Sequence, residues 1–269
     1  MKPLTQTIGL FLLLLVGLAS AEPTAQTSPP FKFSDQEAWM GIYYKGKKLG
    51  FSHHVLRVSS GAVEVKSRAY FRVKAAGADQ VTSFAQETFL TPDLRLKNFF
   101  LLQEIMGHRQ KVQGRLDEGV LTVHVTTLGY SKKKSIPFSP ETAMSATFGL
   151  NLLRDGLQVG RKGTLPIFME PLRIFSELEY EILRKESMTF EGKPVDTYVV
   201  QHRISGMDSH LWVTPEGLLL RELSTDGFES RIESRETARE LGESMPISSF
   251  ITLSLVKARL NDPRRPLGV

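Results

Sequence analysis

Residues 39–58 read WMGIYYKGKKLGFSHHVLRV, and this stretch decides the fold class. On both sides of Lys45-Gly46-Lys47, apolar and polar side chains alternate with a period of two. That pattern is typical of two β-strands joined by a tight turn. The same period returns over residues 63–71 and 120–128, where β-branched side chains are frequent. We therefore expect a mainly β protein.

Between residues 139 and 155 the period changes to that of a helix. Ser139 can cap the amino end, and Met144, Phe148 and Leu152 recur at a spacing of four. An Asp-Gly pair closes the segment, and glycine is the usual residue after a helix. The pattern predicts one central α-helix over residues 139–155.

Strand patterns separated by turn residues resume after the helix, including an ambiguous segment at residues 176–190 that we interpret as a strand. The expected fold is a curved antiparallel sheet or open half-barrel with one central α-helix against it. The antiparallel β domain spans residues 39–244. It can be divided into two sub-lobes, 39–137 and 157–244, joined by the helix.

The first 21 residues have the features of a secretory signal peptide. Lys2 precedes an apolar run over residues 8–18, and Ala19-Ser20-Ala21 has the small residues that a signal peptidase requires. Residues 22–38 are then a linker, and residues 245–269 a C-terminal tail. We expect a bacterial periplasmic protein exported by the general secretion route.

The composition excludes several functions. The chain has no cysteine, so disulfides, thiolate metal sites and cysteine nucleophiles are ruled out. The net charge is only +5 and no dense basic tract occurs, so we expect no nucleic acid partner. Lys132-Lys133-Lys134 is the densest basic run. We interpret it as a solvated hairpin end or an edge strand, where lysines discourage aggregation.

The adjacent histidines His53 and His54 raise the question of a metal site. On a strand, neighbouring side chains point to opposite faces, so the two cannot bind one ion without a bulge. The other histidines, His202 with His210 and His108 with His124, have no partner at ligand spacing. We predict no metal and no cofactor.

Catalytic signatures are also missing. The sequence contains no nucleophile elbow, zinc-protease helix motif, phosphate-binding loop or calcium loop. Two Ser-x-x-Lys matches, Ser131 to Lys134 and Ser254 to Lys257, lack the companion elements. Glu177, Glu179 and Glu181 read as the solvated face of a strand. We predict no catalytic residue and no enzyme activity; a hydrolase with an unrecognised site is the remaining enzymatic alternative.

Aromatic and methionine side chains recur in the first half of the chain. In a half-barrel they could line a cavity for an acyl chain, or they could form an ordinary core. The set comprises Trp39, Phe51, Phe71, Phe84, Phe89, Phe99, Phe100 and Met106.

Two stretches resemble a known family. WMGIYYKGKKLGFSHH at residues 39–54 and DSHLWVTPEGLLLRELS at 208–224 look like hairpins in the β-rich N-terminal region of bacterial secreted transglutaminase-like proteins. Residues 248–265 resemble the segment that leads into the catalytic domain there. This chain has no cysteine, so the resemblance implies the non-catalytic half alone. In outline the expected sheet is also similar to periplasmic lipoprotein carriers.

These observations favour a non-catalytic periplasmic interaction or accessory module, paired with a separate transglutaminase-like enzyme. Its tail, residues 245–269, would be the docking element. The alternative is a periplasmic carrier that binds a lipid or another apolar ligand in the half-barrel. The expected partner is an envelope protein or a lipid.

Overall fold

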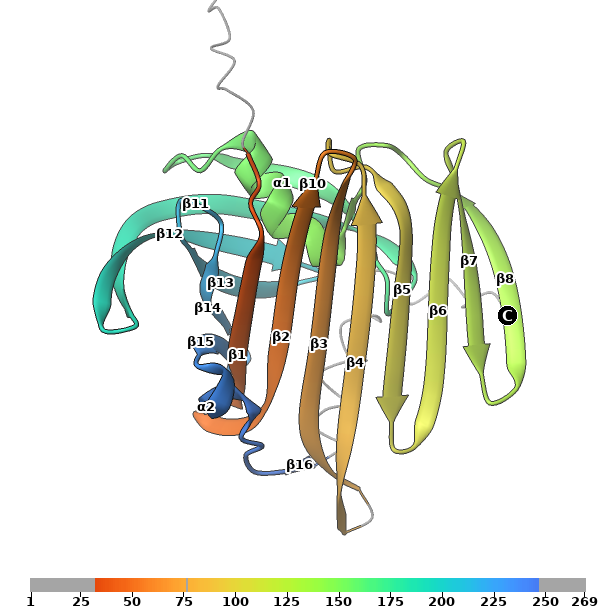
Figure 1. Ribbon diagram of the computed structural model, residues 1–269, viewed down its shortest axis with the longest axis horizontal. Helices are drawn as coiled ribbons and strands as arrows, with labels where there is room; N and C mark the ends of the chain where they lie inside the picture. The colour runs from red at the N-terminus through yellow and green to blue at the C-terminus, as the bar shows by residue number, and fades with distance from the viewer. Residues whose placement is uncertain (1–31, 76, 247–269) are drawn as a thin grey trace, which may run out of the picture. The chain divides into compact units, whose positions relative to one another are not determined.

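A computed structural model describes residues 32–75 and 77–246, all of which belong to one compact unit, Phe31–Val269. Sixteen strands in this part of the chain form one strongly curved sheet (Figure 1). Those before the helix are β1 (Gln36–Tyr44), β2 (Lys47–Ser59), β3 (Ala62–Ala75), β4 (Ala78–Leu90), β5 (Leu96–Ile105), β6 (His108–Asp117), β7 (Val120–Thr127), β8 (Tyr130–Pro137) and β9 (Ala143–Met144). Those after it are β10 (Lys162–Met169), β11 (Ile174–Phe190), β12 (Lys193–Ile204), β13 (Met207–Val213), β14 (Leu219–Ser224), β15 (Phe228–Glu233) and β16 (Met245–Pro246).

The sheet is built from two runs of successive hairpins, which confirms the mainly β, curved antiparallel fold. The strand order is β8 to β1 followed by β15 to β9, and β1 pairs with β15. That pairing joins the two runs into one sheet, so the strands of the two expected sub-lobes belong to a single unit. The segment 174–190 is a strand, as expected. The turn residues Lys45 and Gly46 both have positive φ, which suits a tight hairpin.

The central helix is shorter than the sequence pattern predicts. It starts at Phe148, not Ser139, as α1 (Phe148–Asp155) after a 3₁₀ turn, η1 (Ser145–Thr147). The Thr142 N–H donates to the Ser139 carbonyl at 3.0 Å, which makes a turn there. β9 then pairs in parallel with β10, so sheet pairing overrides the helix propensity of these residues.

Two other boundaries also differ from expectation. β1 begins at Gln36, so the last three residues of the predicted linker are strand. In the predicted tail, β16 pairs in parallel with β3 at Val73 and Lys74. The signal peptide and the rest of the tail lie outside the described residues. A second helix, α2 (Arg235–Arg239), follows β15. No described helix is both long and apolar enough to span a membrane.

We call the side of the sheet that carries Met40, Leu56 and Val200 the inner face. The core has two clusters. One lies on β2 to β8 and includes Met144 of β9 and Phe168 of β10, and the other is formed by α1 with β9 to β14. The sheet curls until the outer side of β10 meets the inner side of β5, where the Phe168 ring centroid lies 6.1 Å from that of Phe99. Gly114 on β6 leaves room for the Phe99 ring, because a Cβ there would overlap it. Packing thus brings β10, near one end of the sheet, onto the inner side of β5.

Candidate functional site

An apolar pocket of about 170 Å³ lies on the inner face between β1, β2 and α1. None of its lining residues is Asp, Glu, Lys or Arg. They are Gln36, Ala38, Met40, His54, Val55, Leu56, Val65, Ala146, Gly149, Leu150, Gly217, Leu218 and Leu219. Alternation places Ala38, Met40 and His54 on the same face, because Ala38 pairs directly with His54. The helix contributes Gly149 at the rim, where a Cβ would meet no atom within 4 Å.

His54 is the only titratable group in this pocket. Its Nε2 lies 2.9 Å from the Ser52 hydroxyl. Burial lowers the pKa of His54 to about 4 from an ordinary value of 6.5, against the opposing effect of the Glu222 carboxylate. The imidazole is therefore neutral at neutral pH. The pocket is uncharged and suits an apolar group.

The neighbouring histidine lies on the other side of the sheet. His53 stacks on Trp39 with ring centroids 4.0 Å apart, and its Nε2 lies 2.9 Å from Glu37 Oε1. The expectation that His53 and His54 face opposite ways is confirmed. Among the described residues, no group of three potential ligands could hold a metal ion.

A second polar pair, His202 with Glu222, lies on the inner face, where the Glu222 side chain is 39% exposed. His202 is buried, and neither ring nitrogen has a hydrogen-bond partner among the described residues. Its Nε2 lies 3.6 Å from Glu222 Oε1, which is beyond hydrogen-bond range. The Phe148 ring of α1 packs against the imidazole at 5.4 Å. This pair places two polar side chains on the inner face. The sequence pattern did not predict that His202 and Glu222 meet.

A buried acid lies where the end of β10 meets the inner side of β4. Glu170, just after β10, is completely buried. It accepts a hydrogen bond from Gln86 Nε2 at 2.9 Å and another from the Ser145 hydroxyl. Burial raises the pKa of Glu170 above its ordinary value of 4.5, although these bonds act in the opposite direction. Both side chains donate a hydrogen bond to the carboxyl, which therefore links β4, η1 and the end of β10.

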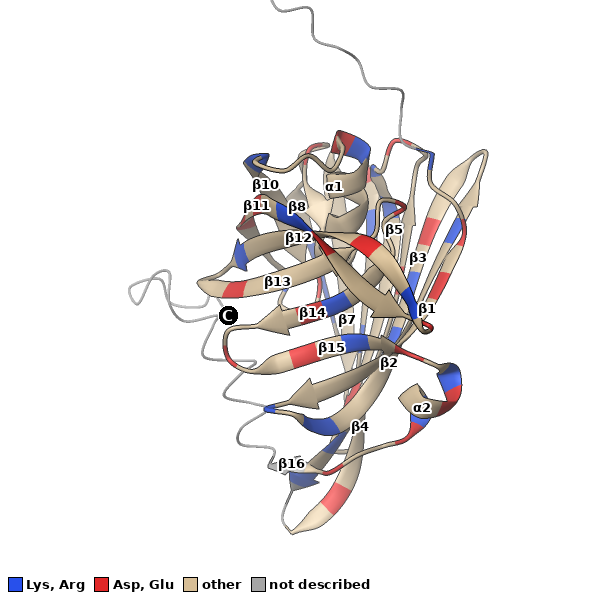
Figure 2. Ribbon diagram, turned by 90° about the vertical axis from the view of Figure 1, so that its left-hand side faces the viewer, with Lys and Arg blue, Asp and Glu red and all other residues tan. Residues whose placement is uncertain are grey.

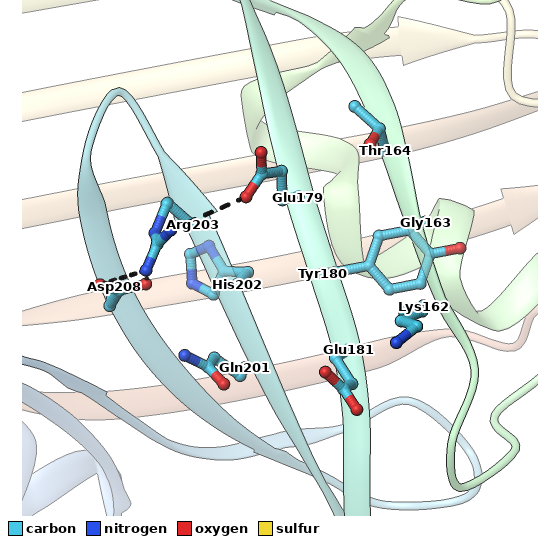
Figure 3. Close-up of a pocket in the computed structure, with 10 residues that line it drawn as sticks. All are labelled: Lys162, Gly163, Thr164, Glu179, Tyr180, Glu181, Gln201, His202, Arg203 and Asp208. Carbon is cyan, nitrogen blue, oxygen red and sulfur yellow. Dashed lines mark hydrogen bonds and ion pairs between the residues drawn. The ribbon is translucent and has the colours of Figure 1, made fainter.

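A polar depression of about 370 Å³ lies on β10 to β13 (Figure 3). Arg203 is held there between two carboxylates, 2.8 Å from Asp208 Oδ1 and 4.0 Å from Glu179 Oε2. Because the Arg203 guanidinium already has two carboxylate partners, we interpret this depression as a solvated face of the sheet with its own ion pairs. Glu177 and Glu179 are exposed, as the sequence predicted, whereas Glu181 is half-buried.

Other sequence-predicted groups do not converge. Lys132, Lys133 and Lys134 are exposed on β8, which is an edge strand, as expected. Ser131 and Lys134 lie on this strand and not on a helix, while Ser254 and Lys257 lie outside the described residues. His202 faces inward beside Ser209, and His210 faces outward beside Gln201.

The aromatic residues do not form one cavity lining. Phe99 is buried in the core. Trp39 and Phe51 lie on the outer face, and so does Phe100, whose ring is 5.4 Å from the Lys111 ammonium. The cavity-lining hypothesis was wrong for these three residues, since β-strand alternation turned them outward.

Comparisons with known proteins support the fold alone. No family model matches the sequence, and no curated protein matches it. In fold, the chain is similar to a β-barrel-like protein of unknown function, DUF1849, from Brucella abortus. The two are 11% identical over 75% of this chain and 97% of that chain, with a TM-score of 0.57. A DUF1089 family protein from Pseudomonas aeruginosa is 14% identical over 78% and 95% of the chains, with a TM-score of 0.36. The fold defines the class: a β-barrel-like protein built on one open antiparallel sheet.

Proposed function

We propose that this protein is a non-catalytic binding protein of the bacterial cell envelope, and that it holds an apolar group on its inner face. The observation that carries the proposal is the uncharged pocket between β1, β2 and α1. Its lining side chains are mostly aliphatic, and its one titratable group is neutral at neutral pH.

The size of the pocket limits the ligand. A protein cavity of about 150 Å³ is known to hold a benzene-sized molecule. A pocket of about 170 Å³ therefore fits a single ring or a short stretch of an acyl chain, not a whole phospholipid. The rest of a longer ligand would extend from the rim at Gly149.

The test uses the chain from residue 22 onward, purified from a bacterial periplasm and weighed by native mass spectrometry. Delipidated protein is then mixed with octanoate or dodecanoate. Gly149→Trp should block uptake by covering the rim, while Gly149→Ala, which adds one methyl group in open space, should retain it. If wild-type protein takes up neither acid and carries no extra mass, the proposal is wrong.

A second candidate is an interaction module that pairs with a transglutaminase-like enzyme through the β8 edge. The specific observation is the exposed apolar surface beside this edge: Leu128 is 78% exposed and Tyr130 62% exposed. A free strand edge can pair with a strand of a partner protein. The lysines on β8 disfavour pairing with strands of unrelated proteins. The predicted docking tail lies mostly outside the described residues.

A photo-crosslinking amino acid at Tyr130 tests this candidate in intact cells, with one at the exposed Thr189 as the control. A specific crosslink to an envelope protein from the Tyr130 position alone supports it. Equal crosslinking from both positions, or none from Tyr130, contradicts it.

A further inference from the structure

A row of aromatic rings runs across the outer face of β1 to β3, on the opposite side from the pocket. Trp39 and His53 form one cross-strand stack, and Phe51 and Tyr70 form another, with ring centroids 4.9 Å apart. Trp39 and Phe51 connect the two stacks at 6.1 Å. None of these side chains is fully buried. The rings offer apolar surface to a ligand from outside the sheet.

Three arginines border these rings. Arg68 comes from β3, and Arg235 and Arg239 come from α2, which lies beside β1 (Figure 1). Together with the rings and Leu241 they line a groove of about 540 Å³. We call it the aromatic-arginine groove.

The guanidinium groups of this groove have no anionic partner within the described residues. Within residues 32–75 and 77–246, none of the three arginines forms an ion pair or a side-chain hydrogen bond. Arg235 lies over the Trp39 ring at 5.4 Å, a cation–π distance. Elsewhere charges of both signs lie close together, as on β14 and β15 (Figure 2), where Arg221 pairs with Glu229 at 2.9 Å. Three unpaired arginines in one groove can therefore bind an anion.

The groove is held rigidly, because Lys48 of β2 joins α2 to the end of β15. Lys48 Nζ lies 2.7 Å from Glu233 Oε2 and also donates to the Thr237 carbonyl. Ser234 caps the helix through the Thr237 N–H at 3.1 Å, and Ala238 is completely buried. A rigid site loses little entropy when it binds a ligand.

The mixture of groups indicates the ligand class. Arginine pairs with carboxylates in a bidentate geometry, and flat rings stack on cyclic molecules that have an apolar face. Glu37 lies at the Trp39 end, where its Oε1 is 3.3 Å from the indole Nε1 and 2.9 Å from His53 Nε2. Its Oε2, 3.7 Å from Arg57, belongs to an exposed carboxylate and can accept a hydrogen bond from a hydroxyl group. A simple aromatic acid has no hydroxyls for Glu37, whereas an acidic sugar has hydroxyls, an apolar ring face and a carboxylate.

We propose that the aromatic-arginine groove binds a carbohydrate that carries carboxylate groups. Its ring packs against the exposed parts of Trp39 and Phe51, its carboxylate pairs with Arg235 and Arg239, and its hydroxyls reach Glu37. The proposal concerns a different face of the sheet from the apolar pocket and does not rest on the function proposed above.

The experiment titrates the protein with trigalacturonate and follows the indole N–H signals by NMR. The chain has two tryptophans, Trp39 and the buried Trp212, so only the Trp39 signal should shift. The methyl ester of trigalacturonate is the matched neutral ligand and should bind at least tenfold more weakly. Titrations with galacturonate monomer and with polygalacturonate show whether the groove binds a free sugar or a polymer.

Variants locate the site. Arg239→Gln should weaken trigalacturonate binding at least fivefold. Arg115→Gln, at an exposed arginine on β6, should leave it unchanged. Equal binding of acid and ester, equal loss in both variants, or no shift of Trp39 would overturn the proposal. Binding of triglutamate as tight as that of trigalacturonate would overturn the carbohydrate class and indicate an acidic peptide.

Discussion

Single residues show how tightly the outer network around β1 is packed. A Cβ at Gly41 would lie 2.5 Å from Glu233 Oε2. That carboxylate cannot move freely, because Tyr43 and Lys48 both donate hydrogen bonds to it. Burial is the largest influence on the Glu233 pKa and raises it, yet these bonds and the nearby cations leave it lowered. Gly41 therefore makes room for a buried ionic network.

Gly41→Ala should destabilise the protein by about 1–3 kcal/mol, as overpacking does. Urea unfolding monitored by circular dichroism measures this change. Gly61→Ala is the matched control, because a Cβ there meets nothing within 4 Å and its φ is not positive. Equal stability of the two variants would show that Glu233 can move aside at little cost.

His54 should make stability depend on pH in a defined direction. Its folded pKa of about 4 is below the ordinary value of 6.5, so below pH 6.5 the unfolded chain takes up a proton that the folded chain refuses. Stability contributed by His54 is present above pH 6.5 and is lost as the pH falls toward 4. The loss is at most about 3 kcal/mol.

Urea unfolding of wild-type protein and of His54→Gln at pH 7 and pH 4.5 measures this effect. The free energy of unfolding of His54→Gln should change less between the two pH values than that of the wild type. His124→Gln, at an exposed position on β7, should behave like the wild type. If all three proteins lose the same stability between the two pH values, the neutral buried state of His54 is wrong.

At the scale of elements, the contact between β10 and the inner face of β4 depends on one acid. Glu170→Ala should cost about 2–4 kcal/mol, because it leaves the Gln86 and Ser145 donors without their acceptor and opens a cavity. Chemical denaturation gives the value. Glu177→Ala, at an exposed position on β11, should change stability by less than about 0.5 kcal/mol. If Glu170→Ala destabilises the protein no more than Glu177→Ala does, Glu170 does not hold β10 against β4.

The short helix α2 depends on its cap. Ser234→Ala should cost about 1 kcal/mol and raise amide hydrogen exchange in residues 235–239, because the Thr237 N–H loses its acceptor. Ser234→Asp should restore protection, since aspartate also caps helices. Unchanged exchange in the alanine variant would mean that the Lys48 contacts hold α2 without the cap.

At the scale of the whole molecule, the sheet curls but leaves β8 as an edge. β8 pairs with β7 alone within the described part of the chain, and its three lysines are exposed. Such an edge can pair with another copy of the protein unless charge prevents it. Here Lys132 and Lys134 share the inner side of the strand, across from Val125 and Val123.

Replacing Lys132, Lys133 and Lys134 together by threonine should cause concentration-dependent association, which light scattering detects. The matched triple replacement by arginine retains the charge and should behave like the wild type. If the threonine variant scatters no more light than the arginine variant, the charge of the three lysines does not prevent association through β8.

Much of the fold could be predicted from the sequence because its signals are local. Alternation along residues 39–58, the turn glycines and the change of period near Phe148 each involve only a few neighbouring residues. These signals determined the β class, the opposite orientations of His53 and His54 and the position of the edge lysines. The helix start was wrong because Ala143 and Met144 pair with β10, which lies more than twenty residues further along the chain.

Only the tertiary structure decided which groups meet. Glu170 meets Gln86 across 84 residues of sequence, and Lys48 meets Glu233 across 185. The apolar pocket and the aromatic-arginine groove are built in the same way, from α1 and α2 placed against strands that are remote in the sequence. The period of a strand shows which side chains share a face. It carries no information about which distant element will cover that face, because that choice depends on the curl of the whole sheet.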